Sequence, residues 1–290
     1  MSLRIWVLVA AVLALGCDEE VPPPAYLYVE DAAIVNVLSD IRPFQSVNKL
    51  WVIVEGIGEH GIYPTGSKIP IIPTSDSVRV WFFAGVPING ARFETMIYEA
   101  CAPSVHTLEL RERSIDTLRL QFPYRSEVEF PLYEGFEPGS RGYWEAVDTT
   151  VGYPLTMQIV KASVVENVRY EGRLRLTVDS PAVLMALNKT VGSEAFKGKE
   201  VFLEVSIRNP AMHLAMGFER RSRQGTRRLL NAIVLPDSVA AQWRMFYFRF
   251  TPVIDAEEEA LYRYMIFARL DTTLATAAEL GIDNIKVVAF

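Results

Sequence analysis

The stretch Leu50-Trp51-Val52-Ile53-Val54-Glu55, closed by Gly56, is typical of a β-strand. Short runs rich in Val, Ile, Phe and Tyr and bounded by Gly, Pro, Asn or Asp favour strands over helices. Residues 77–84 repeat this pattern, and residues 69–73 indicate an edge strand, because each of their prolines removes a backbone donor from the ladder. With further strands expected at 107–110 and 117–122, we predict a β-sandwich over residues 26–130.

A second group of strand patterns follows a turn-rich stretch at residues 134–142, which contains three glycines and one proline and is a candidate domain boundary. Two segments alternate between apolar and polar residues, so that their apolar side chains share one face. The side chains expected on that inner face are Leu174, Leu176, Val178, Val201, Leu203, Val205 and Ile207. Residues 243–250 are apolar on both faces apart from two arginines, which predicts a strand in the middle of a sandwich.

Strands expected at 262–270 and 285–290 complete the second group, and helical patterns are confined to residues 255–261 and 272–280. Neither helical segment is long enough to build a layer of its own. The predicted fold class is therefore all-β, with two β-sandwich domains in tandem, the second over residues 131–290.

The N-terminus has the anatomy of a signal peptide over residues 1–16, with one positive charge before the apolar run 5–15. That run is too short to cross a hydrocarbon core of about 30 Å as a helix, which needs roughly 20 residues. The next residue, Cys17, ends a sequence that resembles the bacterial lipobox, although Ala14 stands where most lipoboxes carry a bulky aliphatic residue. We expect lipid on the Cys17 sulfur, which anchors the protein to membrane lipid. The acidic and proline-rich residues 17–25 then form an extended tether.

The composition argues against nucleic acid as a partner and against a disulfide within the chain. Half of the 290 residues are hydrophobic and the formal net charge is −6, with a pI near 5.3. Nucleic acid is disfavoured as a partner, because its binding calls for a basic patch or stripe. Once Cys17 carries lipid, Cys101 has no cysteine partner within the chain, so we expect it to be a small buried apolar residue.

Two sets of short motifs resemble known families. Residues 51–56, the proline-flanked edge segment, residues 78–85 and the turn at 88–90 resemble uncharacterised Bacteroidetes outer-membrane lipoproteins, whose first domain is similar to an immunoglobulin-like or PEGA-like β-sandwich. Residues 133–137 and 281–287 resemble the opening and closing of a galactose-binding-like jelly roll of the carbohydrate-binding-module type. These resemblances imply a fold and an outer-membrane location, but a fold does not by itself imply a function. The acidic residues 18–20 after Cys17 resemble the surface-export signal of Bacteroidetes lipoproteins, whereas in enterobacteria an Asp at position 18 indicates retention in the inner membrane.

Related jelly rolls often hold a structural calcium ion near one end of the sandwich. The resemblance implies Glu137 and Asp283 as its candidate ligands. Calcium takes about six to eight oxygen ligands, and the sequence offers only these two. No other cofactor is expected.

Motifs for catalysis are missing from the sequence. The three histidines His60, His106 and His213 lie far apart and outside any motif with metal-ligand spacing. There is no phosphate-binding loop and no nucleophile elbow. We therefore predict a non-catalytic protein.

Two segments are candidates for binding. Tyr143-Trp144 follows a glycine-rich loop and forms either a stacking platform for a sugar or, for Trp144, part of the core. Residues 220–228 predict a hairpin with Gly225 at its tip, which carries Arg220, Arg221, Arg223, Arg227 and Arg228. Its guanidinium groups either hold carboxylates or phosphates of a partner or keep a solvated strand edge from aggregating.

Two hypotheses for function follow. The first is a surface lipoprotein that binds a glycan through its second domain. The second is a structural subunit of an outer-membrane uptake, secretion or assembly complex, which contacts protein through sheet edges and loops. Exposed aromatic rings with polar neighbours favour the glycan, whereas a large exposed apolar patch favours the protein partner.

Overall fold

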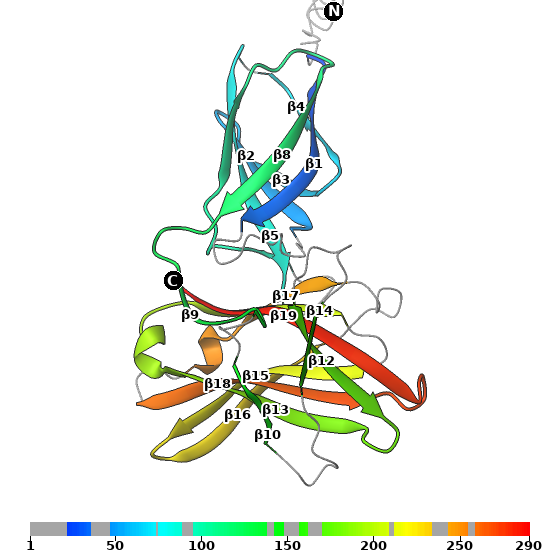
Figure 1. The fold of residues 1–290 in the computed structure, drawn as a ribbon. Helices are drawn as coiled ribbons and strands as arrows, with labels where there is room; N and C mark the ends of the chain where they lie inside the picture. The colour runs from blue at the N-terminus through cyan, green and yellow to red at the C-terminus, as the bar shows by residue number, and fades with distance from the viewer. Residues whose placement is uncertain are drawn as a thin grey trace, which may run out of the picture.

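The computed structural model describes residues 22–35, 47–73, 75–88, 95–137, 142–147, 157–161, 170–208, 212–233, 243–254 and 259–290. Cys17 and the tether up to residue 21 lie outside the described residues. The chain is built almost entirely of strands arranged as two β-sandwiches (Figure 1), which confirms the predicted all-β fold class. Within the described residues, no helix is long and apolar enough to cross a membrane.

The first sandwich consists of a three-stranded and a five-stranded sheet. Its strands are β1 (Ala25–Val35), β2 (Lys49–Val54), β3 (Gly58–Pro64), β4 (Lys68–Ile71), β5 (Val78–Pro87), β6 (Thr95–Ile97), β7 (Ser104–Leu108) and β8 (Ile115–Pro123). One sheet has the order β4-β1-β8, in which β1 and β8 are parallel, and the other has the order β3-β2-β5-β6 with β7 also paired to β5. The proline-containing β4 is an edge strand, as its sequence predicts.

The second sandwich consists of a five-stranded and a six-stranded sheet that enclose a large apolar core. Its strands are β9 (Glu129–Glu134), β10 (Trp144–Ala146), β11 (Gln158–Lys161), β12 (Tyr170–Thr177), β13 (Ala182–Gly192), β14 (Val201–Arg208), β15 (Met212–Ser222), β16 (Gly225–Ile233), β17 (Arg244–Arg249), β18 (Ala260–Leu270) and β19 (Ala277–Ala289). The five-stranded sheet has the order β10-β13-β18-β15-β16. The six-stranded sheet has the order β11-β12-β19-β14-β17, with β9 also paired to β19.

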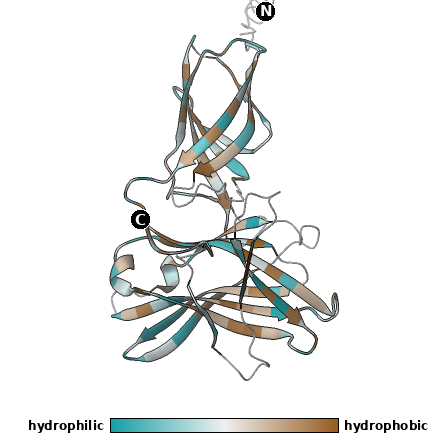
Figure 2. Cartoon of the chain, in the orientation of Figure 1, coloured by the Kyte–Doolittle hydropathy of each residue, from teal (hydrophilic) through white to brown (hydrophobic). Residues whose placement is uncertain are grey.

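The chain has already entered the second sandwich at β9. This strand pairs with the C-terminal half of β19, so the turn-rich stretch 134–142 connects two strands of one sandwich instead of separating two domains. The alternation in the sequence places most side chains correctly: the residues of β12 and β14 predicted to face inward lie in the core, and polar and apolar residues alternate along several strands (Figure 2). Val178 is an exception, because it lies in the turn after β12 and is exposed.

The two helical predictions do not hold. Residues 272–274 form a turn and the strand β19 begins at Ala277, so the alanine-rich segment 272–280 is not a helix. Of residues 255–261, the first four lie outside the described residues and Ala260 and Leu261 begin β18. A short alanine-rich pattern is weak evidence for a helix, because packing against neighbouring strands overrides helix propensity.

Strand β17 lies at the end of the six-stranded sheet, which corrects the expectation that residues 243–250 form a central strand. Phe246 and Phe248 point into the core of the second sandwich. Met245 and Tyr247, on the opposite face, pack into the core of the first sandwich. The strand is apolar on both faces because one sandwich covers each face.

The contact between the sandwiches encloses an ion pair. Glu204 on β14 and Lys286 on β19 lie 2.7 Å apart, and the side chain of each is 1% exposed. Tyr98 and Tyr124, from the first sandwich and the segment after it, both donate hydrogen bonds to the Glu204 carboxylate. Cys101 is a buried free thiol beside this cluster, and burial raises its pKa well above the ordinary value. The cluster joins the two sandwiches through polar groups that are buried or, for Tyr124, partly buried.

Candidate functional site

The five-stranded sheet of the second sandwich has one face in the core and one face turned outward. The residues of β13, β15 and β18 that alternate with core residues make up this outer face. Leu184, Ala186 and Met265 form a small apolar cluster there, separate from the main core, with Leu230 and Phe267 packed against it. The outer side of the sheet therefore has a small apolar layer of its own, the apolar floor, which is buried because these three residues are 7% exposed or less.

A charged network lies beside this floor. The Arg263 side chain is only 6% exposed and pairs with Glu219 at 2.8 Å and with Glu145. Arg221 pairs with the same Glu219 oxygen at 2.5 Å. Burial alone would raise the pKa of Glu219, but the hydrogen bonds from Arg263 and Arg221 hold that pKa below its ordinary value. The network fixes charged side chains in place on a face that borders solvent.

Glu145 is the member of this network that solvent reaches. Its side chain is 56% exposed, yet its carboxylate is bound to the buried Arg263. Glu145 lies on the edge strand β10, and Tyr143 directly precedes that strand, so the two residues are about 7 Å apart along an extended chain. Tyr143 is 78% exposed. The backbone holds it in place through hydrogen bonds with Asn188, whose side chain accepts from the Tyr143 amide and whose amide donates to the Tyr143 carbonyl.

The pair Tyr143-Trp144 is split between two environments. Trp144 points into the sandwich, where its ring stacks on Phe136 with centroids 6.2 Å apart and meets Tyr264 edge to face at 5.6 Å. Successive side chains of a strand point to opposite faces, so the two rings cannot form one platform. The core interpretation applies to Trp144, and the exposed ring needed for sugar stacking is present at Tyr143 alone.

The arginine-rich segment 220–228 forms the predicted hairpin between β15 and β16, with Arg223 and Gln224 in the turn and Gly225 directly after it. Its arginines do not act as one group. Arg220 is 4% exposed, and Arg221 belongs to the network described above. Arg223, at the tip, is 89% exposed and pairs with the equally exposed Glu259. Arg227 and Arg228 lie on the exposed part of β16.

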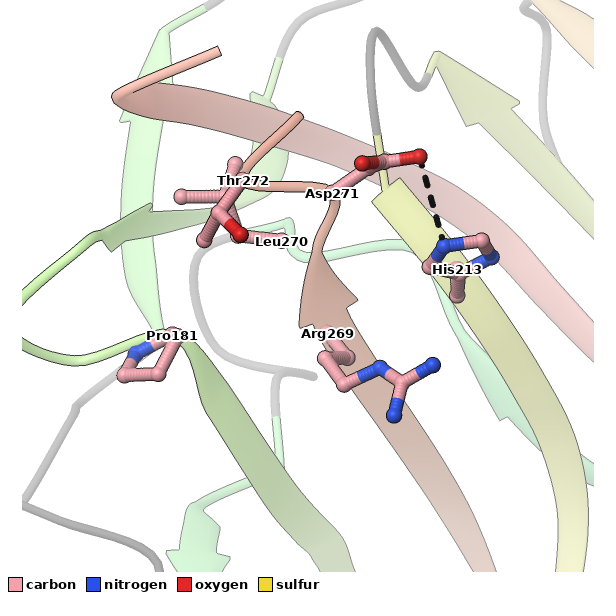
Figure 3. Close-up of a pocket in the computed structure, with 6 residues that line it drawn as sticks. All are labelled: Pro181, His213, Arg269, Leu270, Asp271 and Thr272. Atoms are coloured by element: carbon pink, nitrogen blue, oxygen red, sulfur yellow. Dashed lines mark ion pairs between the residues drawn. The ribbon is translucent and has the colours of Figure 1, made fainter. Parts of the chain in front are cut away.

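An open pocket of about 330 Å³ lies at the other end of the outer face (Figure 3). His213 and Arg269 are directly opposite each other on β15 and β18 and line it together with Pro181, Leu270, Asp271 and Thr272. His213 lies 3.5 Å from the Asp271 carboxylate. The Thr273 hydroxyl holds the pKa of Asp271 below its ordinary value, with smaller contributions from the Thr273 amide and His213.

The calcium ligands predicted from sequence lie in an acidic neighbourhood. Burial raises the pKa of Asp283 well above its ordinary value, and the nearby charges of Glu137, Glu171 and Glu134 raise it further. Both oxygens of Asp283 already accept hydrogen bonds from Asn284. Among the described residues, no group of three or more His, Cys, Asp or Glu side chains is arranged to hold a metal ion. The expected calcium site therefore finds no support in the described part of the chain.

Sequence reasoning missed the charged residues of the outer face. Arg263 and Arg269 interrupt an otherwise apolar strand, and Glu219 ends an apolar run on β15. A charge inside an apolar strand is the signal that was available, because a buried charge needs a partner. The partner itself comes from a strand distant in sequence, which no local pattern reveals.

Comparisons with known proteins found no matching protein-family model and no matching curated protein. Among solved structures, a carbohydrate-binding module described as having promiscuous specificity within the β-sandwich superfamily is 12% identical, covers 92% of this chain and 99% of its own, and has a TM-score of 0.39. The CBM22-1 xylan-binding domain of Paenibacillus barcinonensis Xyn10C is 13% identical, covers 56% of this chain and 94% of its own, and has a TM-score of 0.34.

Enzymes occur among the similar structures as well. The arabinose-bound α-L-arabinofuranosidase MgGH51 is 8% identical, with 54% of this chain and 25% of the enzyme covered, and a TM-score of 0.39. At these values the similarities establish neither a family nor a ligand for this chain.

Proposed function

We propose that the protein is a non-catalytic glycan-binding protein and that the outer face of its five-stranded sheet is the binding surface. The observation that carries this proposal is the pair formed by Tyr143 and Glu145. An exposed aromatic ring lies two residues before a carboxylate that a buried arginine holds in position.

The chemistry of this pair suits a sugar. A pyranose ring has an apolar face that packs on an aromatic side chain, and its hydroxyl groups donate hydrogen bonds to a carboxylate. Because Arg263 fixes Glu145 before a ligand arrives, less side-chain freedom is lost on binding. The apolar floor around Met265 is buried, so the apolar surface that this pair offers to a sugar is the exposed ring of Tyr143. This mixture of an apolar surface and a few fixed polar groups is usual for ligand sites.

The sequence motif at Cys17 supports a further part of the proposal, namely that lipid anchors the protein to the outer membrane and presents it at the cell surface. Two or more acyl chains make such anchoring stable. Mass spectrometry of the protein purified from membranes tests this part. A mature chain that begins at an acylated Cys17 is the expected result, and an unprocessed leader or a free thiol at that position would refute the anchor.

A glycan array, followed by titration of the best-bound oligosaccharide, tests the binding proposal. We expect Tyr143→Ala to weaken binding at least tenfold and Glu145→Gln to weaken it by several-fold, because they remove a stacking surface and a charged acceptor. Ile115→Ala is the matched control, since Ile115 is 52% exposed and lies in the first sandwich. Equal affinity of all four proteins would contradict the assignment of the site.

A protein partner is the second candidate function, and the hairpin between β15 and β16 favours it. Arg223 projects at its tip in an exposed pair, which is worth little in stability and leaves the guanidinium accessible. A pull-down from detergent-solubilised membranes with the wild type and with Arg223→Ala distinguishes the two functions. A stoichiometric membrane-protein partner that the variant loses would favour the subunit.

A further inference from the structure

We infer that the pocket around Arg269 and His213 binds an anionic group of the glycan, so that the protein selects acidic glycans, those carrying carboxylate or sulfate, over neutral ones. This inference rests on the proposed glycan-binding function and assigns its ligand class.

The pocket belongs to the same surface as Tyr143 and Glu145. Arg269 and Arg263 both point to the outer side of β18 and are six residues, or about 20 Å, apart along the strand. Phe267 lies between them on the same side and packs on the apolar floor. An extended oligosaccharide that stacks on Tyr143 can therefore reach the pocket while it remains on one face of the sheet.

Arg269 is a cation that no described carboxylate neutralises. Its side chain is exposed, and the ion pairs of the described residues do not include it, although Asp271 is only two positions away. Asp271 does not pair with Arg269 because both of its carboxylate oxygens face other groups. One of its carboxylate oxygens accepts hydrogen bonds from the amide and hydroxyl of Thr273, and the other faces His213. The Arg269 guanidinium points away from that carboxylate (Figure 3).

The lining includes the Asp271 carboxylate, but its two oxygens face Thr273 and His213, and the Arg269 guanidinium is the group that suits an anion. A guanidinium presents a planar fork of N–H donors that matches a carboxylate or sulfate with two parallel hydrogen bonds. The register places His213 opposite Arg269, and its Nε2 lies 3.5 Å from the Asp271 carboxylate. Thr272 adds a hydroxyl group, and Pro181 and Leu270 supply apolar walls. The pocket is open, so it suits one substituent of a longer chain and not a whole ligand.

A uronic-acid oligosaccharide and its carboxyl-reduced neutral counterpart test this inference, because the two differ only in the anionic group. We expect the full-length wild-type protein to bind the acidic form roughly tenfold more tightly or better, as is usual for a charge-assisted hydrogen-bonded pair. Arg269→Gln should remove this preference, so that the variant binds the acidic and the reduced forms with about equal affinity. Arg269→Lys, which keeps the charge but loses the fork, should retain only part of the preference.

Arg111→Gln is the control, since it removes the same charge from an exposed loop position of the first sandwich. A sulfated oligosaccharide of the same backbone separates the two sources of negative charge. Equal binding of the acidic and reduced forms by the wild type would overturn the inference and leave glycan binding intact, as would an Arg269→Gln variant that weakens both forms alike. Failure of the wild type to bind any glycan on the array would overturn the proposed function itself.

Discussion

Replacement of Lys286 by methionine is the perturbation that tests most sharply how the two sandwiches are held together. Methionine has a similar length and no charge, so Glu204 stays buried without its counterion. At 2.7 Å, two unit charges attract by about 6 kcal/mol at an effective dielectric constant of about 20. Desolvation of both ions offsets much of this attraction. Loss of one partner from a buried pair costs about 3–5 kcal/mol, because the remaining charge is uncompensated.

The second substitution in the test, Glu204→Gln, is chosen because of the hydrogen bonds that Glu204 accepts. Tyr98 and Tyr124 still donate to position 204, so Glu204→Gln keeps an acceptor for them and removes the charge. We expect the double variant Glu204→Gln, Lys286→Met to be more stable than Lys286→Met alone, since no unpaired charge is left at the contact. The four proteins form a double-mutant cycle that isolates the coupling between the two residues.

Urea and thermal unfolding, followed by tryptophan fluorescence, give the energies. For a domain of 150–250 residues, 1 kcal/mol lowers the melting temperature by about 2–4 °C, so Lys286→Met should lower it by roughly 6–20 °C. The reasoning fails if Lys286→Met stays within about 1 kcal/mol of the wild type. It also fails if the effects of the two single substitutions simply add, because the residues would then not be coupled.

Three further predictions concern the second sandwich. Trp144→Ala should lower the free energy of unfolding by about 2–4 kcal/mol because it removes a partly buried ring that packs against the core, whereas Tyr143→Ala should change it by less than about 0.5 kcal/mol, and urea denaturation compares the two directly. The lowered pKa of Glu219 stabilises the fold above the unfolded-state pKa, and this contribution is lost as the pH falls through the folded-state pKa. Melting temperatures between pH 7 and pH 3 should therefore converge for the wild type and Glu219→Gln, and a constant gap would contradict the assignment. The raised pKa of Asp283 has the opposite effect on stability, because the folded protein favours the protonated carboxyl. This contribution to the free energy of unfolding is fully present below the unfolded-state pKa and is lost as the pH rises towards the folded-state pKa. Asp283→Asn should thus melt higher than the wild type at pH 7 and equally at pH 3, and a variant that melts lower at pH 7 would refute this.

Much of the fold follows from the period of two in the sequence. The alternation in residues 200–207 correctly puts Val201, Leu203, Val205 and Ile207 in the core, and the proline of β4, Pro70, correctly marks an edge. Residues 243–250 show where such reasoning fails. Their sequence reports burial on both faces, but it cannot tell a central strand from an edge strand that a second sandwich covers.

The candidate site was only partly predictable for a related reason. Exposure of Tyr143 and burial of Trp144 follow from strand alternation once the strand is placed, and the hairpin at 220–228 follows from its composition and Gly225. The pairing of Arg263 with Glu145 and Glu219 joins three strands that are far apart in sequence. The register of the sheet creates it, so it becomes visible only when the strand order is known.

A crystal structure of the protein with the best-bound oligosaccharide from the array tests the central claim most directly. We predict a sugar ring stacked on Tyr143, with a hydroxyl group hydrogen-bonded to the Glu145 carboxylate and the chain lying across the outer face of the five-stranded sheet. An oligosaccharide bound to any other surface, with Tyr143 and Glu145 free of contact, would contradict the account.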